Sequence, residues 1–289
     1  MTEARSAVLA VPGAELHYDV RPAAPGSADQ PPLLLIGSPM DAAGFTTLAG
    51  HFPDRTVVTY DPRAAARSRR TDGATRTTPE EHADDLHRLI DVVGGPVDLF
   101  ASSGGAVNAL VLVARHPEQV RTLVAHEPPA AQVLPDREAA LAAVTDIHES
   151  YLKHGLGVGM AKFILLVGHQ GPVPDDFPQW PVDPARFGLP TEDDGSRDDA
   201  LLGQNMIGCN YHQHDFDALR AASTRVVIAV GEKSGSTLAR RAGEIVAERI
   251  GRTAVIFPGD HGGFMGGEYG MPPGEPDAFA AKLREVLAG

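Results

Sequence analysis

The chain has 289 residues, a formal net charge of −13 and a single cysteine, Cys209. This length suffices for one large domain with an insertion, and the negative charge argues against nucleic acid or an anionic membrane as a partner. One cysteine excludes an internal disulfide and is typical of a reducing compartment. The chain starts without a signal-peptide pattern, and no apolar run approaches membrane-spanning length. We therefore expect a soluble cytoplasmic protein.

Short apolar runs alternate with helical patterns along the chain, which predicts an α/β fold with a mostly parallel central sheet covered by helices on both faces. Thr78 before Pro79 is the expected N-cap of one of the helices. The predicted strands cover residues 6–11 and 15–20 as a hairpin, then 33–36, 57–60, 97–102, 120–125, 226–230 and 254–257. The predicted helices lie near residues 42–51, 79–93, 104–115, 237–250 and 276–287.

The pattern changes between residues 131 and 223. Amphipathic stretches at 137–153, 157–167 and 198–206 surround a proline- and aspartate-rich loop at 171–195, and none of them is typical of a central strand. We therefore predict a core of residues 1–130 and 224–289, with residues 131–223 inserted as a helical cap. This insertion is called the 131–223 segment below.

Ser103 is the most informative residue of the chain. It follows the predicted strand 97–102 and precedes a predicted helix, in Ala101-Ser102-Ser103-Gly104-Gly105. A tight strand-to-helix turn exposes a serine hydroxyl and aims the next backbone N–H at a developing oxyanion. Such a turn needs small residues two before and two after the serine, and Ala101 and Gly105 meet that requirement. The pattern predicts a nucleophilic serine, as a variant of G-x-S-x-G with alanine in the first position.

A nucleophilic serine needs a histidine base, and position selects one of the twelve histidines. His261 lies in a glycine-rich loop directly after the last predicted strand. The carboxyl ends of parallel strands meet at one edge of the sheet, so this loop should lie at the same edge as the Ser103 turn. We predict His261 as the general base.

The carboxylate that orients His261 has three candidates. Asp260 is adjacent to His261, and neighbouring side chains rarely converge well enough to orient the ring. Glu232 follows the predicted strand 226–230, and Glu127 follows the strand next after the Ser103 helix. Because adjacent parallel strands lie about 4.8 Å apart, Glu127 should emerge close to Ser103.

These residues resemble the α/β-hydrolase superfamily over nearly the whole chain, in the elbow, the His261 loop and the chain order of serine, acid and histidine. Two positions depart from that pattern: Ser234 stands where this fold most often has its catalytic aspartate, and Ala101 replaces the first elbow glycine. The stretch 101–129, with Ser-Ser-Gly and His-Glu-Pro-Pro, is similar to the zearalenone-type lactone hydrolases. That resemblance implies a Ser–His–Glu triad with Glu127 as the acid and Glu232 as the runner-up.

The oxyanion hole should consist of two backbone N–H groups. Gly104 supplies the donor after the nucleophile, and the turn Ile36-Gly37-Ser38-Pro39 supplies the other. Pro39 cannot donate. We expect the Ser38 N–H in this role, with Gly37 as the alternative.

Several other residues could contact a substrate. Met40 follows the oxyanion turn, and the 131–223 segment contributes Trp180, Tyr211, His212 and His214, which could equally be packing residues. Cys209, His212, His214 and His169 have ligand types that zinc accepts, but they lack a convincing fourth ligand, and the triad requires no metal. We expect neither a metal nor another cofactor.

The arginines Arg63, Arg67, Arg69 and Arg70 form a basic cluster after the predicted strand 57–60. It could bind a phosphate or carboxylate, or it could be a solvated loop braced by local ion pairs, which the acidic context favours.

The sequence therefore predicts a serine hydrolase that cleaves a carboxylic ester or lactone of a small organic molecule through an acyl-enzyme. The same triad serves lyases, cyclases and perhydrolases, and the fold also includes ligand-binding members without activity. The sequence leaves open the substrate and the oligomeric state, a homo-oligomer included.

Overall fold

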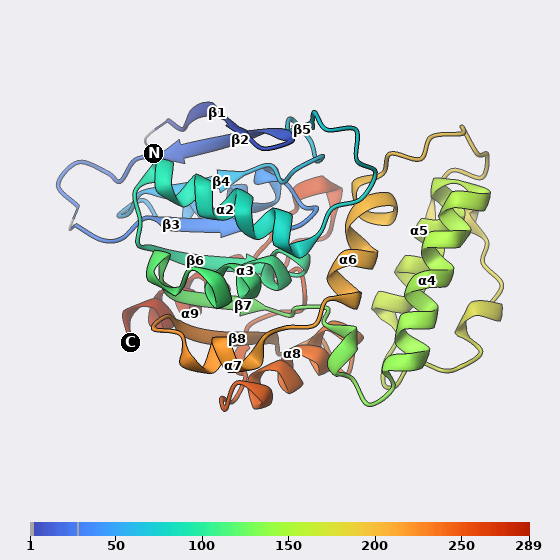
Figure 1. The fold of residues 1–289 in the computed structure, drawn as a ribbon. Coiled ribbons are helices and arrows are strands. Elements are labelled where there is room, and N and C mark those ends of the chain that lie inside the picture. Colours follow the sequence, from blue (N-terminus) through green and yellow to red (C-terminus); the bar gives the residue numbers. More distant parts are fainter. Residues whose placement is uncertain (1–2, 28) are drawn as a thin grey trace.

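The computed structural model describes residues 3–27 and 29–289, and its centre is one mixed sheet (Figure 1). The sheet order is β1-β2-β4-β3-β6-β7-β8-β9, and β5 pairs with β2. The strands from β4 to β9 along this path are parallel to one another, whereas β2 is antiparallel to β1, β4 and β5. The strands are β1 (Arg5–Val11), β2 (Ala14–Arg21), β3 (Leu33–Ile36), β4 (Val57–Tyr60), β5 (Arg69–Arg70), β6 (Val97–Ser102), β7 (Val120–His126), β8 (Arg225–Gly231) and β9 (Val255–Phe257).

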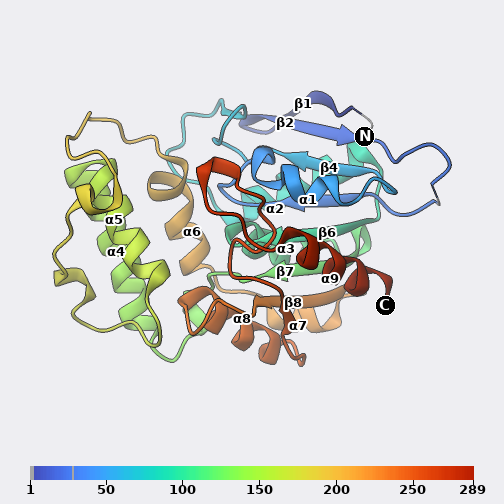
Figure 2. The same cartoon turned by 180° about the vertical axis from the view of Figure 1, so that it is seen from behind.

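Helices cover both faces of the sheet, as Figures 1 and 2 show from opposite sides. Helices α2 (Pro79–Val93), α3 (Gly104–Arg115), α7 (Phe216–Ala221) and α8 (Leu238–Arg249) lie on one face, and α1 (Thr46–Gly50) and α9 (Pro276–Ala288) lie on the other. Each face buries its own apolar cluster against the sheet. The α/β fold with a mostly parallel, helix-flanked sheet is thus confirmed.

Most predicted elements form within a residue or two of their expected bounds. Thr78 caps α2 with a complete capping box, in which its hydroxyl accepts from the Glu81 N–H and the Glu81 carboxylate accepts from the Thr78 N–H. The short elements β5 and α7 were not predicted, because two to six residues carry too little periodicity to stand out. The expected helix over 42–51 is a 3₁₀ turn, Ala42–Phe45, followed by α1.

The 131–223 segment places three helices beyond the carboxyl ends of the parallel strands. These are α4 (Arg137–His154), α5 (Leu156–Gly168) and α6 (Met206–Tyr211), and α6 lies between the sheet and the α4–α5 pair (Figures 1 and 2). The predicted helix over 198–206 is instead a π-helix, Ala200–Asn205, that continues into α6. The segment thus leaves the core after the carboxyl end of β7, at the sheet edge where the candidate site residues meet. It returns through α7 to the opposite edge, where β8 starts and Ser223 contacts Pro117.

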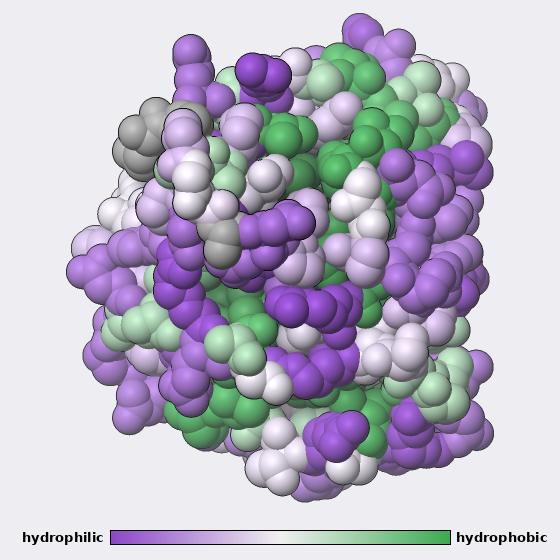
Figure 3. All heavy atoms as spheres, turned by 90° about the vertical axis from the view of Figure 1, so that its left-hand side faces the viewer, coloured by the Kyte–Doolittle hydropathy of each residue, from purple (hydrophilic) through white to green (hydrophobic). Residues whose placement is uncertain are grey.

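The opposite end of the molecule, where the parallel strands start, shows mostly hydrophilic residues with hydrophobic ones between them (Figure 3). Within the described residues, no helix combines the length and the apolar character needed to cross a membrane.

Candidate active site

Ser103 occupies a strained turn between β6 and α3. Its φ is 57° and its ψ is −126°, a combination that few residues other than glycine adopt. The turn is held by a hydrogen bond of 2.9 Å from the Ser103 N–H to the His126 carbonyl on β7. Ala101 is fully buried, and a Cβ on Gly105 would lie 2.9 Å from the backbone of Gly37. These positions therefore require small residues, as expected for a nucleophile elbow.

Glu127 follows β7 with a φ of 47°, which turns the chain out of the strand. Its side chain is fully buried. One carboxylate oxygen, Oε1, accepts the Gly231 N–H at 2.9 Å, and the other, Oε2, lies 2.6 Å from Nδ1 of His261. The carboxylate is thus fixed on both sides, and it contacts the histidine that the sequence selects as the base.

The pKa of Glu127 is lowered to about 2. Burial by itself would raise this pKa, but the hydrogen bond with His261, the positive potential of His126 and His261 and the nearby Ser234 hydroxyl together outweigh it. The carboxylate is therefore ionised at neutral pH, the state needed to orient an imidazole and stabilise its protonated form.

The two other acid candidates lie elsewhere. Glu232 comes after the end of β8 with its side chain exposed, and its N–H bonds to the Phe257 carbonyl. Asp260 is also exposed, and its Oδ1 accepts the Gly262 N–H within its own turn. Among the described residues, Glu127 alone has a carboxylate hydrogen-bonded to the His261 ring.

The predicted oxyanion donors Ser38 and Gly104 are next to each other. Ser38 is 5% exposed, and a Cβ on Gly104 would overlap the Ser38 carbonyl oxygen. Gly37, the alternative donor, packs against Gly105 and against Met40. The turn after β3 and the start of α3 are therefore in contact along their backbones.

The predicted substrate-contacting residues have different surroundings. Met40 packs on Gly37 and Gly44, so it lies beside the oxyanion turn. Trp180 packs against Phe177 within the 131–223 segment, with ring centroids 5.1 Å apart. Tyr211 is 40% exposed, and its hydroxyl is 2.7 Å from that of Thr145.

His212 and His214 line a hollow of about 550 Å³ together with Gln132, Val133, Arg137, Gln213, Phe216 and Arg249. Ser103, Glu127 and His261 do not line this hollow. His214 is 9% exposed, and burial lowers its pKa to about 3. His212 lies 3.3 Å from Glu80. Both histidines therefore contact residues away from the Ser103 turn.

The structure does not favour a zinc site at Cys209. No group of three or more histidine, cysteine, aspartate or glutamate residues within the described ranges is arranged to hold a metal ion. The Cys209 thiol donates to Asn205 Oδ1 at 2.8 Å, and burial raises its pKa to about 12. The thiol is therefore already paired with an acceptor inside the protein.

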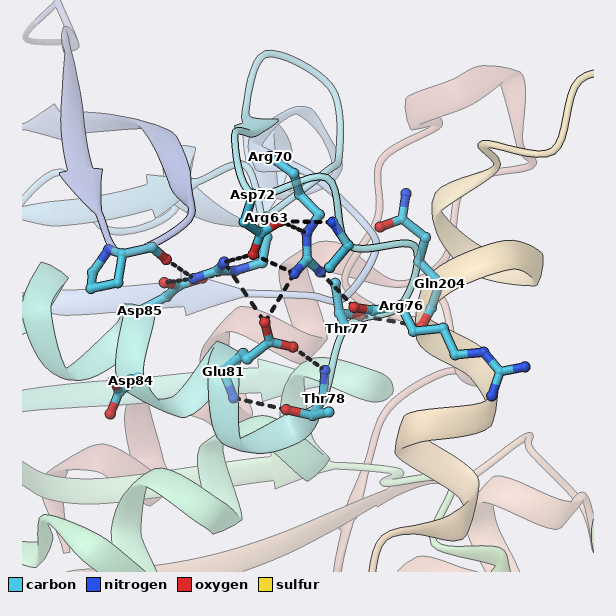
Figure 4. Close-up of polar contacts among 12 residues, drawn as sticks. Arg63, Arg70, Asp72, Arg76, Thr77, Thr78, Glu81, Asp84, Asp85 and Gln204 are labelled. Atoms are coloured by element: carbon cyan, nitrogen blue, oxygen red, sulfur yellow. Dashed lines mark hydrogen bonds and ion pairs between the residues drawn. The ribbon is translucent and has the colours of Figure 1, made fainter.

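Carboxylates pair each arginine of the basic cluster. Figure 4 shows the pairs of Arg63 and Arg70. Arg63 binds Asp85 with two hydrogen bonds, of 2.7 and 3.0 Å, and both side chains are buried. Arg70 binds Asp72 and Glu81, Arg67 binds the buried Asp61 and the half-buried Asp19, and Arg69 forms an exposed pair with Glu15. The cluster is therefore a set of ion pairs, part of it buried rather than solvated, that joins the 61–77 loop to α2, and its charge is not free for an external anion.

Sequence reasoning missed two residues at this edge of the sheet. His126 is fully buried, and its ring packs nearly parallel to that of His261, with centroids 5.8 Å apart. Burial lowers the pKa of His126 to about 4. Its position directly before the acid candidate Glu127 is the sequence feature that could have indicated it. Asn205, the second residue, ends the π-helix and contacts Ser38. No sequence pattern connects positions so far apart.

Comparisons with known proteins agree with this architecture. The chain is 31% identical over 269 residues to an uncharacterized hydrolase, YraK, of Bacillus subtilis, covering 89% of each protein. The chain therefore belongs to the α/β-hydrolase superfamily. No family model matches it.

Solved structures share the fold at lower identity. A thermophilic esterase from Thermogutta terrifontis superposes with a TM-score of 0.66 at 20% identity, covering 99% of this chain and 98% of the esterase. An enol-lactonase from Burkholderia xenovorans superposes with a TM-score of 0.59 at 16% identity, covering 98% of this chain and all of the lactonase. At these identities the likeness concerns the fold.

Proposed function

We propose that the protein is a serine hydrolase that cleaves a carboxylic ester or lactone of a small molecule through a Ser103–His261–Glu127 triad. The observation that carries this proposal is the 2.6 Å contact between His261 Nδ1 and the buried, ionised Glu127. Burial of a carboxylate costs free energy unless the charge is well paired. A histidine with no role beyond a surface loop would not need such a partner. The strained Ser103 turn at the same sheet edge supports it.

In this mechanism Ser103 Oγ attacks the substrate carbonyl carbon while His261 takes the hydroxyl proton. Because Nδ1 is paired with Glu127, Nε2 is the nitrogen left to accept that proton. The N–H groups of Ser38 and Gly104 stabilise the oxyanion of the tetrahedral intermediate.

Collapse of this intermediate breaks the ester C–O bond, and His261 returns the proton to the leaving alkoxide. In a lactone the freed hydroxyl stays attached to the acyl group. Water, activated by the same histidine, then hydrolyses the acyl-enzyme and releases the acid.

The ester and lactone classes are proposed from the triad, and the esterase and enol-lactonase neighbours are consistent with them. Helices α4, α5 and α6 are the proposed cap, since they stand beyond the sheet edge that carries the triad. The cytoplasm remains the proposed compartment, because the single cysteine is a buried free thiol.

Labelling with a fluorophosphonate, followed by peptide mass spectrometry, tests the proposal. One adduct on Ser103, lost in Ser103→Ala, together with turnover of an activated ester, is the expected result. A folded protein that neither labels at Ser103 nor hydrolyses esters or lactones would contradict it, and a ligand-binding role would then be favoured. A labelled serine without net hydrolysis would instead favour lyase, cyclase or perhydrolase chemistry.

A further inference from the structure

The buried side chain of Asn205 connects the 131–223 segment to the turn that follows β3. Asn205 is the last residue of the π-helix Ala200–Asn205 and is 4% exposed. Its Nδ2 donates to Ser38 Oγ, and its Oδ1 accepts the thiol of Cys209 at 2.8 Å. Both ends of the amide are therefore paired, which fixes its orientation. Single π-helical turns frequently occur at functional sites.

The partners of Asn205 reach both proposed oxyanion donors. Ser38 carries one of the two N–H groups. Cys209 Sγ lies 3.2 Å from the point that a Cβ on Gly104 would occupy, so it packs against the residue that carries the other. The Ser38 carbonyl oxygen packs on the same side of Gly104. Asn205 thus lies where the turn after β3, the start of α3 and α6 come together.

We propose that Asn205 is a positioning residue for the oxyanion hole. By holding the Ser38 hydroxyl, it fixes the backbone of Ser38 opposite Gly104, so that the two N–H groups are arranged before the substrate binds. This inference rests on the proposed function, because an oxyanion hole matters only if Ser103 is acylated. Through Asn205, the 131–223 segment would contribute to catalysis by positioning Ser38, independently of any contact that the segment makes with substrate.

The expected effect falls on the transition state. Donors must lie close to the place of the oxyanion, and the negative charge there develops only after attack. A turn that shifts by a fraction of an ångström still admits the neutral substrate, so KM should change little while kcat falls. Loss of one oxyanion donor costs roughly 10²- to 10³-fold in kcat, and a displaced donor should cost less, roughly 10- to 100-fold.

The first experiment measures kcat and KM with an activated ester for Asn205→Ala, Ser38→Ala and the double variant. Each single change should lower kcat roughly 10- to 100-fold with KM nearly constant. If Asn205 acts through Ser38, the double variant should be no slower than the slower single variant. Losses that multiply in the double variant would overturn the inference.

Asn210→Ala is the matched control. Asn210 is an equally buried asparagine in the adjoining helix α6, 7% exposed, and its Nδ2 donates to the Met206 carbonyl at 2.9 Å rather than to the oxyanion turn. Asn210→Ala should lower stability about as much as Asn205→Ala but keep the kcat of the unaltered protein. Equal losses of kcat in the two variants would show a structural role and overturn the inference.

The fluorophosphonate reaction distinguishes a failure of the proposed hydrolase function from a failure of the proposed role of Asn205. If the unaltered protein neither labels at Ser103 nor turns over esters, the proposed function fails and the inference fails with it. If the unaltered protein reacts but Asn205→Ala labels and turns over at the same rate, only the inference fails. Should Asn205→Ala not fold, Ser38→Ala alone decides, since an unchanged kcat in that variant also overturns the inference.

Discussion

The Nδ1 atom of His261 lies 2.6 Å from Oε2 of Glu127, although the two residues are 134 positions apart in the chain. The two residues follow β9 and β7, and β8 lies between these strands. Their side chains therefore meet over the end of β8. Gly231 ends that strand, and a Cβ there would lie 2.9 Å from the Asp260 backbone. A residue without a side chain thus allows the pair to form and donates its N–H to the same carboxylate.

Replacement of Glu127 should reveal whether this pair is catalytic. Glu127→Gln keeps the shape but removes the charge that stabilises protonated His261, so kcat for an activated ester should fall roughly 10³- to 10⁴-fold. Glu232→Gln is the matched control, and its exposed side chain should leave kcat nearly unchanged. The reverse order of effects, measured by steady-state kinetics, would transfer the role of the acid to Glu232.

The backbone contact at Gly104 should tolerate no side chain. In Gly104→Ala the new Cβ overlaps the Ser38 carbonyl oxygen, so the turn must move and kcat should fall roughly 10²-fold. Gly168→Ala is the control, because nothing lies within 4 Å of a Cβ at the end of α5. Rates of ester hydrolysis and of fluorophosphonate labelling provide the measurement. Equal rates in the two variants would mean that the position of the turn after β3 does not affect the reaction.

Removal of one partner of the buried Arg63–Asp85 pair should cost far more stability than removal of one partner of an exposed pair (Figure 4). Arg63→Met leaves Asp85 buried without its partner and should lower the free energy of unfolding by about 3–5 kcal/mol. In the control, Arg69→Met removes an exposed pair with Glu15 and should cost less than about 1 kcal/mol. Urea unfolding measures both, and a double variant Arg63→Met with Asp85→Leu should recover much of the loss.

The buried ring of His82 should make the protein less stable in acid. His82 is 1% exposed, and burial, with help from the positive charges of Arg63 and Arg70, lowers its pKa from 6.5 to about 3. Below pH 6.5 the His82 ring is protonated in the unfolded chain but stays neutral in the folded protein. The free energy of unfolding therefore falls as the pH drops toward 3. At about pH 5 this difference in protonation lowers the free energy of unfolding by about 2 kcal/mol.

Unfolding in urea at about pH 7 and about pH 5 tests this account. His82→Leu should shrink the difference between the two free energies of unfolding by about 2 kcal/mol, because it removes the titrating ring. His154→Leu, which replaces an exposed histidine at the end of α4, should leave the difference as it is. An unchanged difference in His82→Leu would show that other groups control the acid sensitivity.

Much of the architecture could be predicted from local sequence. The apolar runs at 33–36 and 97–102 have the length of buried parallel strands, and both form with all residues buried. Thr78, Pro79 and Glu81 specify the start of α2 by themselves, because a capping box needs only four consecutive residues. The tight turn at Ser103 could also be predicted from the sequence, since it depends on small residues at fixed spacing around one serine.

The sequence by itself determined the alternation of strands and helices, the serine turn and the candidate histidine, because each is encoded within a few adjacent residues. Only the tertiary structure decided which carboxylate lies against His261. The parallel register of β7 with β8 pairs His126 with Ala229, which brings Glu127 beside Gly231 and leaves Glu232 beyond the strand end. The contact between Asn205 and Ser38, 167 positions apart in the sequence, likewise depends on how the intervening chain packs. Such long-range contacts follow from the burial of whole helices and strands, and no local pattern records them.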